Sequence, residues 1–159
     1  MMDFIGIYPE LLSAERCQAM IAQFDASKAS VPGRVGGGVM PELKHSRDIQ
    51  LDQHPEWRAT ERELNTAMFR ALLAYVREYP YALIAPLLLQ RKGADGTLQR
   101  YQHDDIAALD DKALGDLLRA VFRPGTINIQ RYEADQGGYP YWHSCLLYTS
   151  DAADDLLCV

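Results

Sequence analysis

The sequence predicts an α+β protein, and two observations carry that prediction. Residues 14–27, 55–78 and 110–122 place apolar side chains at intervals of three and four, which is typical of amphipathic helices. Residues 126–132, TINIQRY, are rich in β-branched side chains and precede a glycine turn, which is typical of a strand. Together these patterns favour a mixed fold in which helices flank strands.

The bulk composition favours a single domain and excludes some partners. The 159 residues are 48% hydrophobic, which suits one domain with a core, and the net charge is −6. No run of Lys and Arg alternates with aromatics, so we expect no nucleic-acid partner and no anionic membrane partner. The first residues lack the pattern of a signal peptide, and no apolar run approaches the roughly 20 residues of a membrane span. Three cysteines form no disulfide framework, so we expect a reducing cytoplasm.

The first predicted element is a helix over residues 14–27 that Ser13 caps. Its apolar stripe holds Cys17, Met20, Ile21 and Phe24, which predicts a buried face and an inert, buried thiol at Cys17.

A glycine-containing stretch, residues 31–51, follows and predicts a flexible loop that leads into a short strand over 49–51. Its GRVGGG segment lacks the Gly-Lys-Ser/Thr ending of a phosphate loop. His45 and Asp48 lie beside basic residues, and solvated charge is the favoured interpretation over a metal pair.

The longest predicted helix covers residues 55–78, with Pro55 in its first turn. Its apolar positions are Leu64, Met68, Leu72 and Tyr75. The next run, residues 81–89, is short and apolar and stays ambiguous between a strand and buried coil.

Two further elements precede the candidate site. Asp95-Gly96 predicts a turn, and residues 110–122 predict a helix that buries its leucines and ends at Pro124. The segment 103–105, His-Asp-Asp, is interpreted as an acidic lead-in to a helix rather than a metal site. Adjacent side chains of an extended segment point to opposite sides and cannot share one ion.

The order strand, glycine turn, aromatic cluster and histidine is the pattern that carries chemistry. Non-haem Fe(II) oxygenases hold their metal with two histidines and one carboxylate and leave positions open for cosubstrate and oxygen. The first histidine and the carboxylate commonly lie two residues apart, because strand residues i and i+2 point to the same side.

The segment IQRYEADQGGYPYWHS, residues 129–144, resembles the iron-site entry of 2-oxoglutarate/Fe(II)-dependent oxygenases of the prolyl-4-hydroxylase-like branch. VMPELKHSRDIQL, residues 39–51, shows a weaker likeness to the region before that branch's long helix. The resemblance implies that residues 1–144 are the N-terminal portion of a single oxygenase domain. It also implies an incomplete double-stranded β-helix, or jelly roll, with flanking helices.

The resemblance also implies roles for individual residues. His143 would be the first iron ligand, and Tyr132 would donate a hydrogen bond to a carboxylate of 2-oxoglutarate. Tyr139, Tyr141 and Trp142 would line the substrate pocket. For the tyrosines and the tryptophan, ordinary strand packing is the alternative. The implied cofactors are Fe(II) and 2-oxoglutarate, and the substrate is a small molecule or a peptide.

The sequence departs from the family pattern after His143. The position two residues later is Cys145 where the family has Asp or Glu, and neither a His nor a Lys or Arg follows. We therefore expect the chain as written to hold Fe(II) and 2-oxoglutarate poorly and to be inactive. His-x-Cys alone is a weak zinc signal.

The segment CLLYTSDAADDLLCV, residues 145–159, resembles the translation of a transposase sequencing adapter. On this hypothesis it is a non-native tail, and the remaining strands of the jelly roll are absent, which would leave unpaired, aggregation-prone sheet edges. The alternative is a genuine acidic end. Two other functions stay open: a non-catalytic binding protein on a degenerate oxygenase scaffold, and a helical interaction module built on residues 55–78.

Overall fold

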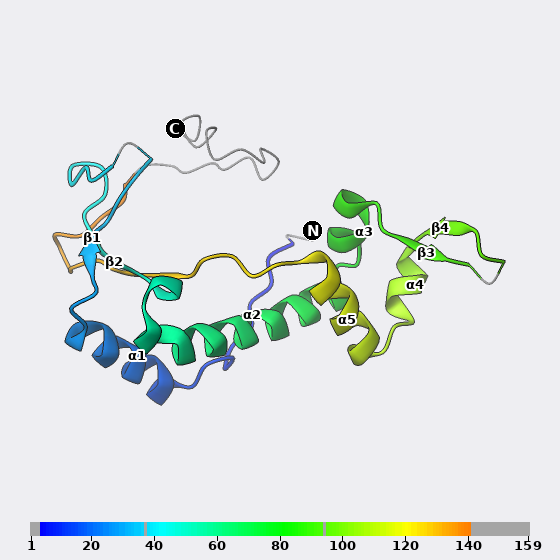
Figure 1. Ribbon diagram of the computed structural model, residues 1–159, viewed down its shortest axis with the longest axis horizontal. Helices are drawn as coiled ribbons and strands as arrows, with labels where there is room; N and C mark the ends of the chain where they lie inside the picture. The colour runs from blue at the N-terminus through cyan, green and yellow to red at the C-terminus, as the bar shows by residue number, and fades with distance from the viewer. Residues whose placement is uncertain (1–3, 37, 94, 141–159) are drawn as a thin grey trace. The chain divides into compact units, whose positions relative to one another are not determined.

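The computed structural model describes residues 4–36, 38–93 and 95–140, in two compact units (Figure 1). The first unit contains residues 4–19 and 59–125, and the second contains residues 20–58 and 126–140. The described residues form helices and small antiparallel sheets, so the predicted α+β class is confirmed.

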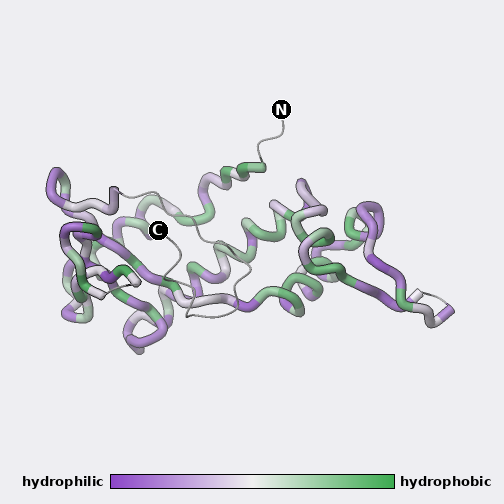
Figure 2. Tube along the Cα trace, turned by 90° about the horizontal axis from the view of Figure 1, so that it is seen from above, coloured by the Kyte–Doolittle hydropathy of each residue, from purple (hydrophilic) through white to green (hydrophobic). Residues whose placement is uncertain are grey.

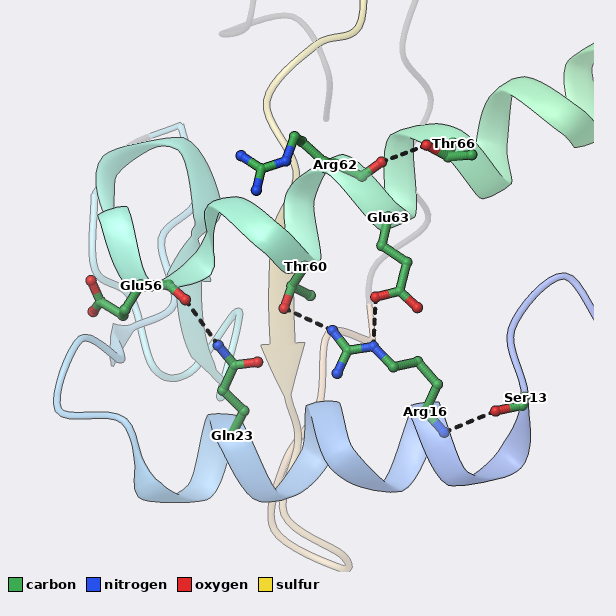
Figure 3. A network of polar contacts seen from close by, with 8 residues as sticks. All are labelled: Ser13, Arg16, Gln23, Glu56, Thr60, Arg62, Glu63 and Thr66. Carbon is green, nitrogen blue, oxygen red and sulfur yellow. Dashed lines mark hydrogen bonds and ion pairs between the residues drawn. The ribbon is translucent and has the colours of Figure 1, made fainter.

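Helix α1 (Ala14–Ala26) confirms the first predicted helix, but its predicted buried stripe is wrong except at Phe24. Ile21 is 53% exposed and Cys17 is only half-buried, so the thiol is not enclosed as predicted. Polar side chains of this helix, by contrast, make contacts with other segments. Arg16 donates to Glu63 at 2.5 Å and to Thr60 at 3.0 Å within the first unit (Figure 3).

The first unit is built on helix α2 (Arg58–Glu78) and helix α5 (Asp111–Val121). Both helices were predicted, although Pro55–Trp57 forms a separate 3-10 turn before α2. Asp110 caps α5 by accepting from the amide of Ala113 at 2.7 Å. The core of the unit is a cluster of fully buried apolar side chains: Val76, Leu83, Ile106, Leu114 and Leu118.

The ambiguous run over residues 81–89 folds as helix α3 (Tyr81–Leu87), so neither the strand nor the coil interpretation was right. Leu83 enters the core from this helix, and Leu88 ends it in the left-handed conformation at φ 47°. A short apolar run has no periodicity that separates helix from strand, and here packing of Leu83 decides the outcome.

A hairpin and a short helix complete the first unit. Strands β3 (Gln90–Lys92) and β4 (Leu98–Arg100) pair around the predicted turn, where Gly96 has φ +80°. Figure 2 shows that this hairpin is mostly hydrophilic. Helix α4 (His103–Ala107) was not predicted: the His-Asp-Asp segment, expected to be extended, forms the first turn of this separate helix.

The carboxylate of Asp105 stabilises the start of α4, and its contribution to folding stability should depend on pH. Its carboxylate accepts from the Gln102 amide at 2.9 Å and from Arg91 Nη2 at 2.6 Å, and these bonds hold its pKa below the ordinary value of 3.8. A lowered folded-state pKa stabilises the fold above the ordinary pKa, and the gain is lost as pH falls through the folded-state value.

We expect Asp105→Asn to be less stable than the unaltered chain at neutral pH, with the difference disappearing in acid. Urea unfolding against pH measures this, with Asp104→Asn as the control. A difference that does not change with pH would contradict it.

The second unit contains a three-stranded antiparallel sheet of order β1-β2-β5. Its strands are β1 (Val31–Pro32), β2 (Arg47–Gln50) and β5 (Asn128–Arg131). The strand predicted over residues 126–132 is therefore confirmed in its centre. The one predicted over 49–51 begins two residues earlier and ends one residue earlier, at Gln50, because Leu51 begins the 3-10 turn η1 (Leu51–Gln53).

Candidate functional site

The two faces of the sheet in the second unit carry different side chains: isoleucines and arginines lie on one face, and amides and Asp48 lie on the other, the polar face. Side chains alternate along a strand, so residues paired across β2 and β5 share a face. Ile49 pairs with Ile129 and is fully buried. The alternate pairs, Asp48 with Gln130 and Gln50 with Asn128, line a pocket of about 530 Å³ on the polar face.

Asp48 is the centre of the hydrogen bonds in this pocket. Its carboxylate accepts from Lys44 Nζ at 2.7 Å, from Ser46 Oγ at 2.7 Å and from Gln130 Nε2 at 3.3 Å. The side chains of Lys44 and Asp48 are only 7% and 16% exposed. The prediction of solvated charge at Asp48 is therefore wrong, because the ion pair with Lys44 lets the carboxylate leave solvent.

Gly33 brings the loop before β2 close to this network. Its amide donates to the carbonyl of Ser46 at 2.9 Å, and a Cβ at this position would lie 2.1 Å from Ser46 Oγ. The predicted flexible loop is thus held against the sheet at Gly33, where an added Cβ would displace the Ser46 hydroxyl from its position beside Asp48.

Tyr132 follows β5 directly and lies on the side of the polar face. Its hydroxyl donates to Gln130 Oε1 at 3.1 Å, and the residue is 39% exposed. Gln130 lines the pocket, and Tyr132, one residue beyond the end of β5, reaches its edge through this hydrogen bond without lining it. Its phenol is therefore a hydrogen-bond donor beside the pocket, held by a side chain that itself bonds to Asp48.

The glycine turn after Tyr132 returns the chain to β2's N-terminal side. His45 and Gly138 exchange backbone hydrogen bonds of 2.8 and 3.2 Å, and His45 Nδ1 lies 2.6 Å from the Gln136 carbonyl. Since a carbonyl only accepts, Nδ1 carries the proton. His45 and Asp48 thus bind different partners, and His45 fixes the turn. Tyr139, the first predicted pocket residue, comes next and is 39% exposed.

Gly137 is the position where this turn requires glycine. An added Cβ would lie 2.5 Å from the amide nitrogen of Glu133 and 2.8 Å from Tyr132 Cα, both in the backbone. We expect Gly137→Ala to open the turn, displace Tyr132 and lower the free energy of unfolding by about 1–3 kcal/mol. Urea denaturation of this variant beside Gly125→Ala, where nothing lies within 4 Å of the added Cβ, measures the effect. Equal stability of the two variants would contradict the predicted clash.

Three predicted site residues, Tyr141, Trp142 and His143, lie outside the described residues, as does the segment 145–159. Within the described residues no three His, Cys, Asp or Glu side chains cluster as a metal site would need. Of the predicted site residues that the structure describes, Tyr132 and Tyr139 lie on either side of the glycine turn, and Gly137 packs against Tyr132.

Sequence reasoning missed the polar network around Asp48. Two signals were present: Lys44 and Asp48 are four residues apart, and Asn128, Gln130 and Tyr132 recur at every second position of a strand. The second pattern predicts that the polar side chains share one face of the strand, because every second residue points to the same side. Such a face can line a pocket.

Comparison with known proteins gives no match: no family model, no curated protein and no solved structure is similar to this chain. Among the described residues, no helix combines the length and the apolar character that crossing a bilayer needs.

Proposed function

We propose that the chain is part of an Fe(II)/2-oxoglutarate-dependent oxygenase of the prolyl-4-hydroxylase-like type, with residues 1–144 belonging to its single domain. Such an enzyme converts 2-oxoglutarate and O₂ to succinate and CO₂ while it hydroxylates a small molecule or a peptide. In this proposal β1, β2 and β5 belong to a jelly roll whose polar face lines the active site.

The observation that carries the proposal is the position of the Tyr132 phenol beside the polar pocket. Its hydroxyl now donates to Gln130 and could donate equally to a carboxylate oxygen. The pocket wall is also suited to an anion, because Arg34 and Lys44 line it together with a single carboxylate, Asp48. These described residues fit one end of 2-oxoglutarate.

Fe(II), when bound, would supply oxygen activation, and the proposed protein ligand is His143. The described residues have other tasks: Tyr132 orients the cosubstrate, and Asp48 holds Gln130 in place beside it. His143 follows the turn at Gly138 in the sequence, with four residues between them.

The first experiment is to read the source DNA across the codon for Ser144. We expect the frame to continue with Asp or Glu two residues after His143, then a later His followed by Arg or Lys. The protein encoded by that frame should decarboxylate 2-oxoglutarate with Fe(II), and Tyr132→Phe should raise its KM for 2-oxoglutarate about tenfold, the loss of one charge-assisted hydrogen bond.

The second candidate is a non-catalytic binding protein on the same scaffold. It is favoured by Cys145, which stands where the family has its carboxylate ligand. If residues 145–159 prove to be genomic, the oxygenase proposal falls and this candidate replaces it.

A further inference from the structure

A second pocket lies in the first unit, between α2, α5 and the N-terminal segment. It has a volume of about 820 Å³, and its walls are mostly apolar. Met68, Phe69, Leu72 and Phe122 line it, and Met68 is 54% exposed. Pockets of this size and character are typical of sites for small organic ligands.

Two polar atoms in the pocket wall lack partners. The hydroxyl of Tyr8 and Oδ1 of Asn65 are both buried, and neither has a hydrogen-bond partner within the described residues. A buried polar group without a partner costs about 1–3 kcal/mol, so each favours a ligand that supplies one. Tyr8 can donate to a ligand oxygen, and Asn65 Oδ1 can accept from a ligand N–H or O–H.

The charge of the pocket wall is positive. Arg119 and Arg123 line it, and no acidic side chain does. Arg119 stacks 4.6 Å over the Phe69 ring and bonds to Asp116 at 3.1 Å. Arg123 donates to the Arg119 carbonyl at 2.9 Å and has no carboxylate at ion-pair distance among the described residues. Its guanidinium therefore keeps donors for an anion, and guanidinium groups bind carboxylates in a bidentate geometry.

We infer that this pocket binds a small amphipathic carboxylate that carries one hydrogen-bond donor, such as an N-acyl amino acid. The acyl chain packs on Met68, Leu72 and Phe122, and the carboxylate pairs with Arg123. The amide N–H of the ligand bonds to Asn65. This site is separate from the pocket on the β1-β2-β5 sheet, and it does not depend on the proposed oxygenase function.

The test is calorimetric titration of the full chain with N-decanoylglycine and with its methyl ester. The two probes share the acyl chain and the N–H, and only the acid has the charge. We expect the acid to bind about tenfold more tightly than the ester, the effect of one charge-assisted contact of about 1.4 kcal/mol.

Matched variants assign the charge effect to a residue. Arg123→Gln should remove the preference for the acid and leave binding of the ester within about twofold. Arg100→Gln removes the same charge from the exposed strand β4 and should keep the preference. Met68→Glu, at an exposed position of the pocket wall, should weaken binding of the acid more than of the ester, and it serves if Arg123→Gln does not fold.

Three results would overturn the inference. They are failure of the acid to bind at millimolar concentration, equal affinity of acid and ester, and equal losses in the two arginine variants. Sedimentation with and without the probe tests whether a second copy of the chain occupies the pocket. A dimer that the probe does not dissociate would assign the pocket to that copy and overturn the inference.

Discussion

Replacing Asp48 with alanine is expected to lower the free energy of unfolding by about 3 kcal/mol. The variant leaves the ammonium of Lys44, 7% exposed, without its carboxylate partner. It also removes the acceptor of Ser46 Oγ and of Gln130 Nε2. A buried charge that loses its partner keeps its full cost of desolvation, which exceeds the loss of an exposed ion pair several-fold.

Asp52→Ala is the matched control for this prediction, because Asp52 is an exposed aspartate four residues later on η1. Urea denaturation followed by circular dichroism should show a change of less than about 0.5 kcal/mol for the control. The double variant Lys44→Met with Asp48→Leu removes both charges and should recover most of the lost free energy of unfolding. Replacing a buried ion pair with apolar side chains of similar size often leaves stability unchanged. Equal losses in Asp48→Ala and Asp52→Ala would contradict the interpretation that the pair is buried.

The same change also tests the candidate site. Gln130 accepts from Tyr132 and donates to Asp48, so loss of the carboxylate frees Gln130 to turn away from the phenol. In an active full-length protein, Asp48→Ala should therefore raise the KM for 2-oxoglutarate, in the same direction as Tyr132→Phe. Stability and KM then report the two roles of one residue separately.

Elements with a complete repeating signal were predictable from the sequence. Helix α5 has a capping aspartate, four apolar positions on one face and a Pro-Gly stop, and the structure matches its predicted bounds within a residue. Strand β5 was marked by its β-branched residues. In both cases local chemistry and tertiary packing favour the same conformation.

Elements that depend on distant partners were not predictable. Helix α3 places Leu83 in the core, and α1 leaves Ile21 exposed while other side chains of that helix make polar contacts with residues far along the chain (Figure 3). The network around Asp48 is joined to Gly33, whose amide donates to the carbonyl of Ser46. None of these pairings has a signature within a window of ten or so residues, because each joins segments that only the fold brings together.

In the candidate site, too, the local features were predictable from the sequence and the contacts between distant segments were not. The glycine turn was visible as a string, and its requirement for glycine at position 137 follows from backbone contacts within six residues. Its attachment to His45 was not visible, because the two backbone partners, residues 45 and 138, lie 93 positions apart in the sequence. A sequence motif of this kind thus predicts which side chains are near one another along the chain, and the sheet register decides which face they share.

Replacing Leu114 with alanine is expected to lower the free energy of unfolding by about 3 kcal/mol, the other large effect in this chain. Leu114 is fully buried on α5 and packs in the cluster with Val76, Leu83 and Ile106. Its truncation removes the apolar contact area and leaves a cavity that three different helices would have to close together. Helices that are tied by short connections and capped at their ends close such a cavity only in part.

Leu98→Ala makes the same chemical change at a position on β4 that is 67% exposed, and it should cost less than about 0.5 kcal/mol. Urea denaturation of both variants, followed by the helical circular dichroism signal, measures the difference. A small loss at Leu114, equal to that at Leu98, would mean that the cluster is not a close-packed core. The pocket beside α5 would then have no rigid wall, and the affinity difference between N-decanoylglycine and its ester should disappear with it. A large loss at Leu114 beside a small loss at Leu98 would support the close-packed core on which the pocket wall is built.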